Sequence, residues 1–192
     1  MSAALSSALW YLGRGTGVGA LLLLTLSVCL GILTKSGRRL PGMSRFALTD
    51  LHRTASLTGS GLLVVHIVSL FFDPYSQLRL LDFLIPFQGS YRPIFLGLGT
   101  LALDLLVLVV GTSLLRHRLG PRVFRAVHWF TYALWPLALL HGLGIGTDAA
   151  STWFTALAAG CAGLVAMLGA WRLMPAFAQR GRSRIPREVS TR

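Results

Sequence analysis

The sequence predicts an all-α integral membrane protein, a bundle of five transmembrane helices that form one domain. Its 192 residues are 54% hydrophobic and only 12% charged, which is too apolar for an ordinary soluble domain. Five mostly apolar runs are each long enough, at about 22–25 residues, to cross a hydrocarbon core of about 30 Å. Polar segments separate these runs, and basic residues gather in alternate segments.

The five expected spans follow one another along the chain and end at polar or proline-containing breaks. They cover residues 10–34, 48–72, 94–115, 124–146 and 152–174. Helices are the expected form, because a segment in lipid must satisfy its own backbone hydrogen bonds. We therefore expect a short external N-terminus (1–9), one transmembrane domain (10–174) and a basic cytoplasmic tail (175–192).

The lysines and arginines predict the orientation of the bundle. They are concentrated after the first span, after the third span and in the C-terminal tail, at Lys35, Arg38, Arg39, Arg45, Arg116, Arg118, Arg122, Arg125, Arg172, Arg180, Arg182, Arg184, Arg187 and Arg192. The other two loops hold only Arg79 and Arg92, together with acidic residues. By the positive-inside rule, we expect a cell (plasma) membrane protein with its N-terminus outside and its C-terminus in the cytoplasm. Membrane lipid is then its surroundings, and the net charge of +12 gives no reason to expect nucleic-acid binding.

The predicted external loop 73–93 is long and unusually apolar. Its middle, LRLLDFLIPF, is too short to cross a membrane. We expect it to lie along the interface or to fold back over the bundle. A surface lid without a role in chemistry is an equally good interpretation.

Four of the five histidines are confined to two of the predicted spans. His52 and His66 lie on the second span, and His128 and His141 on the fourth, whereas His117 lies in a basic turn. On each span, the two histidines are separated by about 20 Å along the helix axis. Both spans are predicted to run in the same direction, so His52 matches the depth of His128 (the inner pair). His66 likewise matches the depth of His141 (the outer pair).

The matched depths predict that the histidines bind two haems. A lone histidine in a membrane helix often forms only a helix–helix hydrogen bond, but four at matched depths favour a functional site. A small metal ion usually needs three or four protein ligands, and no acid or cysteine lies beside these positions in the sequence. A haem iron needs only two axial ligands, and helical bundles commonly hold such cofactors between facing helices.

Two glycines fit this interpretation. Gly59 and Gly61 lie midway between His52 and His66, where larger side chains would collide with the edges of two macrocycles. Close packing of helices is an equally good explanation for either glycine alone.

Four arginines are candidates for contacts with haem propionates. Arg53 and Arg125 lie near the inner pair, and Arg14 and also Arg92 lie near the outer level. The positive-inside rule already accounts for most of the inner arginines.

The spacing on the fourth span needs a further explanation. At about 100° per residue, 14 positions return to within about 40° of the same helix face, but 13 positions miss it by about 140°. Pro136 lies between His128 and His141, and a proline kink with local unwinding could turn the second histidine back toward the first face.

Asp104 lies in the middle of the third span, within LALDLLVLVV. A carboxyl at this depth is a functional candidate, as a proton relay or as a hydrogen-bond partner for a polar group on a neighbouring span. An ion pair with Arg14 would require Asp104 to lie near the outer surface.

The histidine pattern resembles that of the ferric reductase-like transmembrane domain. This family includes the membrane domains of NADPH oxidases and ferric reductases and the haem subunit of a periplasmic methionine sulfoxide reductase. The stretches WYLGRGTG, LHRTASL, YRP, RAVHW and WPLALLHGLG look like those of its small actinobacterial members. The resemblance covers residues 10–172. It implies a transmembrane cytochrome b in which His52 and His128 hold the iron of an inner haem b, and His66 and His141 that of an outer haem b.

The resemblance also implies an electron-transfer subunit rather than a complete enzyme. Oxidases and ferric reductases of this family continue into a domain that binds FAD and NAD(P)H, and many members have six spans. No G-x-G-x-x-G unit follows the last span here, so we expect no FAD or NAD(P)H site in this chain. Electrons would come from a separate cytoplasmic flavoprotein or iron–sulfur protein and pass to ferric iron, oxygen or a periplasmic reductase.

Three alternatives remain open from the sequence. A haem or metal transporter would be expected to show internal repeats or broken helices around a central site. A haem sensor would bind the cofactor without electron traffic. A quinol-linked cytochrome b would keep both haems and change only the electron donor.

Overall fold

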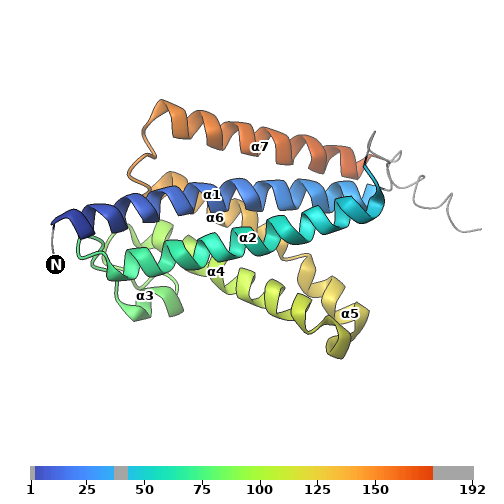
Figure 1. Cartoon of the computed structure of the whole chain (residues 1–192), viewed down its shortest axis with the longest axis horizontal. Helices are drawn as coiled ribbons and strands as arrows, with labels where there is room; N and C mark the ends of the chain where they lie inside the picture. Colours follow the sequence, from blue (N-terminus) through green and yellow to red (C-terminus); the bar gives the residue numbers. More distant parts are fainter. Residues whose placement is uncertain (1–2, 37–42, 175–192) are drawn as a thin grey trace, which may run out of the picture.

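The computed structural model describes residues 3–36 and 43–174 of the chain, and within these ranges the regular structure is entirely helical. The helices are α1 (Ala3–Ser36), α2 (Arg45–Phe72), α3 (Leu80–Leu84), α4 (Pro93–Leu114), α5 (Arg116–His128), α6 (Thr131–Ile145) and α7 (Thr152–Leu173), shown in Figure 1. The predicted N-terminal segment 1–9 is part of α1 from Ala3 onward. The predicted basic tail 175–192 and the loop arginines Arg38 and Arg39 lie outside the described residues.

Four of these helices, α1, α2, α4 and α7, are long and apolar enough to cross a membrane. The protein is therefore a multi-pass membrane protein with an all-helical membrane domain. The helix α6 is also apolar, but its 15 residues are fewer than the roughly 20 that a crossing needs. Whether α5 and α6 together make a fifth crossing stays a prediction, as do the orientation and the plasma membrane.

The fourth predicted span, 124–146, is not one continuous helix. Helix α5 ends at His128 and α6 begins at Thr131. Around this junction the N–H groups of Trp129, Phe130, Tyr132 and Ala133 each donate to the carbonyl three residues earlier, at 3.0–3.3 Å. Such bonds define the tighter 3₁₀ geometry. The junction lies one turn before Pro136, which has no N–H to donate to the Tyr132 carbonyl, so the proline accounts for the irregular turn.

This 3₁₀ turn changes the relation between His128 and His141. Four steps of about 120° in place of about 100° bring the 13 positions to about 60° from a common face, instead of about 140°. The larger rise of the 3₁₀ turn also lengthens the axial separation from about 19.5 Å to about 21.5 Å. The 14 regular positions between His52 and His66 give about 40° and 21 Å. The irregular turn thus makes the spacing on α5–α6 match the spacing on α2.

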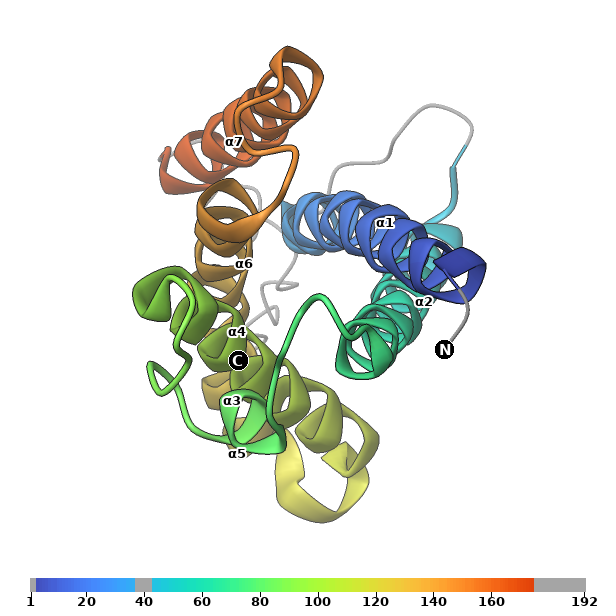
Figure 2. The same ribbon diagram turned by 90° about the vertical axis from the view of Figure 1, so that its left-hand side faces the viewer.

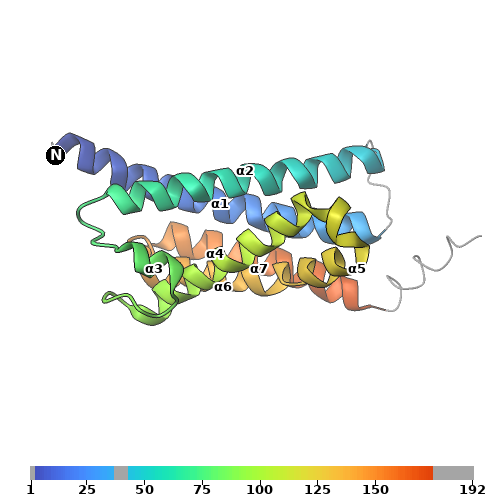
Figure 3. The ribbon, with the colours of Figure 1, turned by 90° about the horizontal axis from the view of Figure 1, so that it is seen from below.

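The helices form two groups along the bundle. Figure 2, which looks along the bundle, shows α1 and α2 as one pair and α4 and α6 as another, with α7 beside α6. Among the described helices, α2 packs closely only against α1. Figure 3 shows α3 at the same end as the N-terminus and α5 at the opposite end. The face of α2 that is turned away from α1 therefore has no closely packed helix beside it.

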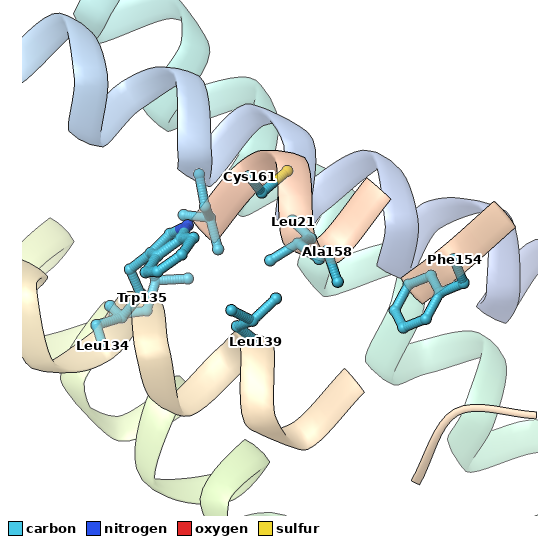
Figure 4. Packing of buried hydrophobic residues seen from close by; sticks show 9 residues of the cluster. Leu21, Leu134, Trp135, Leu139, Phe154, Ala158 and Cys161 are labelled. Atoms are coloured by element: carbon cyan, nitrogen blue, oxygen red, sulfur yellow. The ribbon is translucent and has the colours of Figure 1, made fainter. Parts of the chain in front are cut away.

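The main core joins α1, α6 and α7. Leu21 from α1, Trp135 and Leu139 from α6, and Phe154 and Cys161 from α7 are buried together, as Figure 4 shows. The Trp135 indole Nε1 donates a hydrogen bond of 2.9 Å to the Thr25 hydroxyl of α1, so its polar atom is satisfied inside this core.

The long loop folds back over the bundle, which was one of the two expectations for it. Its short helix α3 rests on the N-terminal part of α4, where the Thr100 hydroxyl donates 2.7 Å to the carbonyl of Asp82. The Asp82 carboxylate accepts the Arg79 backbone N–H at 2.9 Å and its guanidinium at 3.1 Å. These bonds hold the pKa of Asp82 below its usual value. On the other side, Phe83 of α3 makes an edge contact with Phe71 of α2.

Candidate functional site

The inner histidines lie side by side. The ring centroids of His52 on α2 and His128 on α5 are 6.2 Å apart, with the ring planes at 80°. Two imidazoles bound to opposite sides of one metal atom through bonds of about 2.0–2.1 Å would have centroids about 6.4 Å apart. The observed separation of the ring centroids is close to that distance.

The outer histidines come from the same two groups of helices. His66 lies on α2 and His141 on α6, and the two imidazoles are close enough to interact electrostatically. Each pair thus joins α2 to the α5–α6 segment, on the side of α2 that no described helix packs closely against.

Three of these histidines are oriented by backbone carbonyls of neighbouring helices. Nδ1 lies 2.9 Å from the Ser27 carbonyl for His52, 2.7 Å from the Gly13 carbonyl for His66 and 2.8 Å from the Phe95 carbonyl for His141. A carbonyl oxygen can only accept, so Nδ1 must carry the proton in each ring. In a neutral imidazole, Nε2 then keeps its lone pair, which is the arrangement found in histidines that bind metals.

His128 differs from the other three. Its Nδ1 is buried and has no hydrogen-bond partner in the described part of the chain. The ring does stack at 5.2 Å against Phe124, one turn earlier on α5. An orphaned buried nitrogen is costly, so it suggests a missing partner or ligand.

The histidines meet as pairs and not as part of a larger cluster. Among residues 3–36 and 43–174, no three or more His, Cys, Asp or Glu side chains lie close enough to hold one metal ion. None of the four Nε2 atoms makes a hydrogen bond within the same ranges. Two open apolar cavities, of about 310 Å³ between α1 and α7 and about 160 Å³ between α2 and α3, have no histidine in their walls. Pairs of free Nε2 atoms fit a metal whose other ligands come from a cofactor, as in a haem.

Three of the four arginines predicted near the haems have other contacts. Arg14 of α1 forms a two-point ion pair with Asp148, at 2.7 Å from Nε and 2.5 Å from the terminal nitrogen. Arg92 donates 2.5 Å to the Gly144 carbonyl, at the C-terminal end of α6. Arg53 and Arg125 are exposed, and Arg125 donates to the Pro121 carbonyl of its own helix. Propionate contacts by Arg14, Arg53 or Arg125 therefore stay predictions.

The two glycines of α2 have different surroundings. A Cβ at Gly59 would lie 3.2 Å from Leu23 Cβ, so this buried glycine lets α1 and α2 pack closely. A Cβ at Gly61 would have nothing within 4 Å, because Gly61 faces away from α1. Of these two glycines, only Gly61 remains a candidate for making room for the edge of a haem macrocycle.

Asp104 is exposed on α4, and no ion pair with Arg14 exists, because Arg14 pairs with Asp148. The roles of Ser27 and Phe95 could not be predicted, since a backbone carbonyl can belong to any residue. A usable signal was present in the glycines: Gly17 and Gly31 are 14 positions apart, the same spacing as His52 and His66.

Comparison with known proteins identifies the family. The family described as ferric reductase like transmembrane component matches residues 16–139, which is 124 of the 192 residues and includes three of the four histidines. His141 lies two positions beyond the match. No curated protein and no solved structure matches the chain. The resemblance predicted from the histidine pattern is confirmed, and the chain belongs to the ferric reductase-like transmembrane component family.

Proposed function

We propose that this protein is a cytochrome b-type electron-transfer subunit of the plasma membrane, which binds two haems b between its histidine pairs. His52 and His128 would ligate the inner haem, and His66 and His141 the outer one. The supporting observation is the chemistry of the rings: three Nδ1 atoms donate to carbonyls, which leaves each Nε2 free as a ligand. The 6.2 Å separation of the inner rings agrees with two ligands on one iron.

When bound, the two haems would supply one-electron carriers at two depths of the membrane. The chain's own part is to hold the ligand rings at two levels about 21 Å apart along α2 and about 21.5 Å apart along α5–α6. The apolar helices that carry these levels would keep them inside the membrane, away from water. Membership of the ferric reductase-like family supports a role in electron transfer across the membrane.

The electron donor is proposed to be a separate flavoprotein or iron–sulfur protein in the cytoplasm. Helix α5 offers a docking surface for it, because no residue of α5 is buried and four arginines project from it (Arg116, Arg118, Arg122 and Arg125). This surface is continuous with His128, the last residue of α5. Basic surfaces of this kind steer acidic partners into contact and lose their effect at high salt. The acceptor outside would be ferric iron, oxygen or a periplasmic reductase.

We prefer electron transfer to transport because of the junction between α5 and α6. Transporters coordinate ions with carbonyls freed by an unwound segment. Here Trp129 and Phe130 keep right-handed helical angles, and their carbonyls accept the N–H groups of Tyr132 and Ala133. The interruption thus changes the direction of side chains without opening the backbone.

The test is a reduced-minus-oxidised absorption spectrum of the purified full chain. We expect a b-type signal from two haems in the native protein, and about half of it when His66 and His141 are both replaced by alanine. Replacing His52 and His128 should remove the other half. His117→Ala is the matched control, since His117 is exposed on α5, and it should leave the spectrum unchanged. A native protein without haem, or a signal that survives all four substitutions, would refute the proposal.

A further inference from the structure

Three histidines donate a hydrogen bond from Nδ1 to the backbone of a neighbouring helix, and the local arrangement of that backbone is the same in each case. In each case the accepting carbonyl belongs to residue i, and residue i+4 of that helix is a glycine. The combinations are Gly13 with Gly17 for His66, Ser27 with Gly31 for His52, and Phe95 with Gly99 for His141. We call each carbonyl with its glycine a histidine seat. Two seats lie on α1 and one on α4.

The geometry of a helix explains why the glycine is needed. The carbonyl of residue i bonds to the N–H of residue i+4, and the Cβ of residue i+4 is tilted back toward the N-terminus. That Cβ therefore covers the side from which another donor would approach the same carbonyl. A glycine at i+4 removes the obstacle, so that an imidazole can share the oxygen.

The space around the three glycines agrees with this explanation. A Cβ on Gly99 would lie 2.4 Å from Nδ1 and 2.5 Å from Cε1 of His141. A Cβ on Gly17 would lie 2.9 Å from the same two atoms of His66. At Gly31 the shortest distance, to Cε1 of His52, is 3.4 Å, an ordinary contact. The clash between an added Cβ and the imidazole is thus severe at Gly99, marked at Gly17 and slight at Gly31.

The seat on α4 is itself held in place from α6. Phe95, whose carbonyl receives His141, packs its ring against Gly144, where a Cβ would lie 1.9 Å from the ring. The Gly144 carbonyl in turn accepts the Arg92 guanidinium. His141 and Gly144 lie on the same short helix, so α4 and α6 are fixed to each other at the histidine and about one turn after it.

We propose that Gly17 and Gly99, and more weakly Gly31, are positioning residues that fix the tautomer and direction of the haem-ligating histidines. By admitting each ring to a carbonyl, they keep the proton on Nδ1 and present Nε2 as the ligand. A hydrogen bond to the far nitrogen raises the basicity of a histidine ligand, so the seats also lower the reduction potential of the haem. Both outer ligands are seated, whereas the inner haem has one seated ligand, His52. The inference rests on the proposed function for the identity of the metal, but not for the state of the histidines.

The first test measures the tautomers in the full chain without haem. In ¹⁵N-histidine NMR spectra, His52, His66 and His141 should carry the proton on Nδ1, while His128 should show no such preference. Gly99→Ala should abolish the preference of His141 alone, and Gly17→Ala that of His66 alone. Gly15→Ala and Gly111→Ala are matched controls on α1 and α4, the two helices that carry the seats, because a Cβ at either glycine would have nothing within 4 Å. Mixed tautomers in the native chain, or equal effects of seat and control variants, would overturn the inference.

The second test measures haem affinity and reduction potential. Loss of a partner behind a metal ligand typically weakens metal binding about 10–100-fold. We expect a loss of this size at the outer haem for Gly99→Ala and Gly17→Ala, a smaller loss at the inner haem for Gly31→Ala, and none for the controls. Haem that remains bound in a seat variant should have a higher midpoint potential than in the native protein. Absence of haem from the native protein would remove the proposed function but leave the tautomer result standing. If the native protein binds two haems and no seat variant changes their reduction potentials, the inference about the seats is wrong while the proposed function stands.

Discussion

Replacing Pro136 with alanine should abolish haem binding at the inner histidine pair and leave it intact at the outer pair. With an N–H restored at this position, the Tyr132 carbonyl regains its donor, and α5 and α6 can join as one regular helix. Alanine is favoured over proline inside a helix by about 3 kcal/mol, which drives the change. The rotation between His128 and His141 then moves from about 60° to about 140° away from a common face.

The displacement is large compared with what a metal site tolerates. At a side-chain radius of about 5–6 Å, a rotation of about 80° moves an imidazole by about 7 Å, and the axial separation shortens by about 2 Å. Metal–ligand distances tolerate about 0.2 Å. His141 is held by the Phe95 carbonyl, whereas Nδ1 of His128 has no partner in the described chain, so His128 should be the ring that moves.

The assay is the haem content per protein of purified Pro136→Ala, together with its difference spectrum. We expect one haem in place of two, with the inner signal lost and the protein still folded. Pro121→Ala is the control, because Pro121 lies in α5 outside the segment between His128 and His141. Two haems with native spectra in Pro136→Ala would show that the irregular turn does not set the spacing.

Three further predictions concern contacts that hold the bundle together. Asp148→Asn weakens the ion pair with Arg14, whose side chain is 31% exposed; we expect a loss of about 1 kcal/mol, seen as a fall of about 2–4 °C in melting temperature that shrinks at high salt. Trp135→Phe removes a buried hydrogen bond between α6 and α1, and should cost about 1–2 kcal/mol in thermal unfolding while the haem spectrum stays native. Asp82 has a lowered pKa in the folded protein, so its contribution is present above the unfolded value of about 3.9 and is lost as the pH falls below it. Asp82→Asn should therefore lower the melting temperature more at pH 7 than at low pH, with the effect fading as the pH falls through the lowered pKa of Asp82; an equal loss at both would contradict the assignment.

The sequence predicts the long helices well because a change from apolar to polar residues marks where each helix ends. Lipid requires continuous apolar runs, and Asp73 and the arginines near the other ends mark where those runs stop. The break between α5 and α6 is not visible in this way. A change from four-residue to three-residue hydrogen bonding alters no residue type, and Pro136 indicates only that some irregularity lies nearby.

The histidine pairs could be predicted from depth alone, but their partners could not. The seats use backbone carbonyls, which carry no mark in the sequence, and Gly17 or Gly99 looks like any packing glycine. The ion pair of Arg14 joins residues 134 positions apart. Its partner Asp148 lies in a loop whose position depends on how α6 and α7 pack, and no local pattern contains that information.

Each histidine pair also sets an order of events during synthesis. His52 and His66 belong to the α1–α2 hairpin, which leaves the ribosome first, while their counterparts lie on α5 and α6. The 75 residues from His66 to His141 take about 4–15 s to make at roughly 5–20 residues per second. During that time α2 has only α1 beside it, with its histidine rings already held by the carbonyls of Gly13 and Ser27. The hairpin would thus hold half of the proposed ligands in the membrane before the rest exist. A haem could be bound from both sides only after α5, which carries His128, and α6, which carries His141, have been inserted.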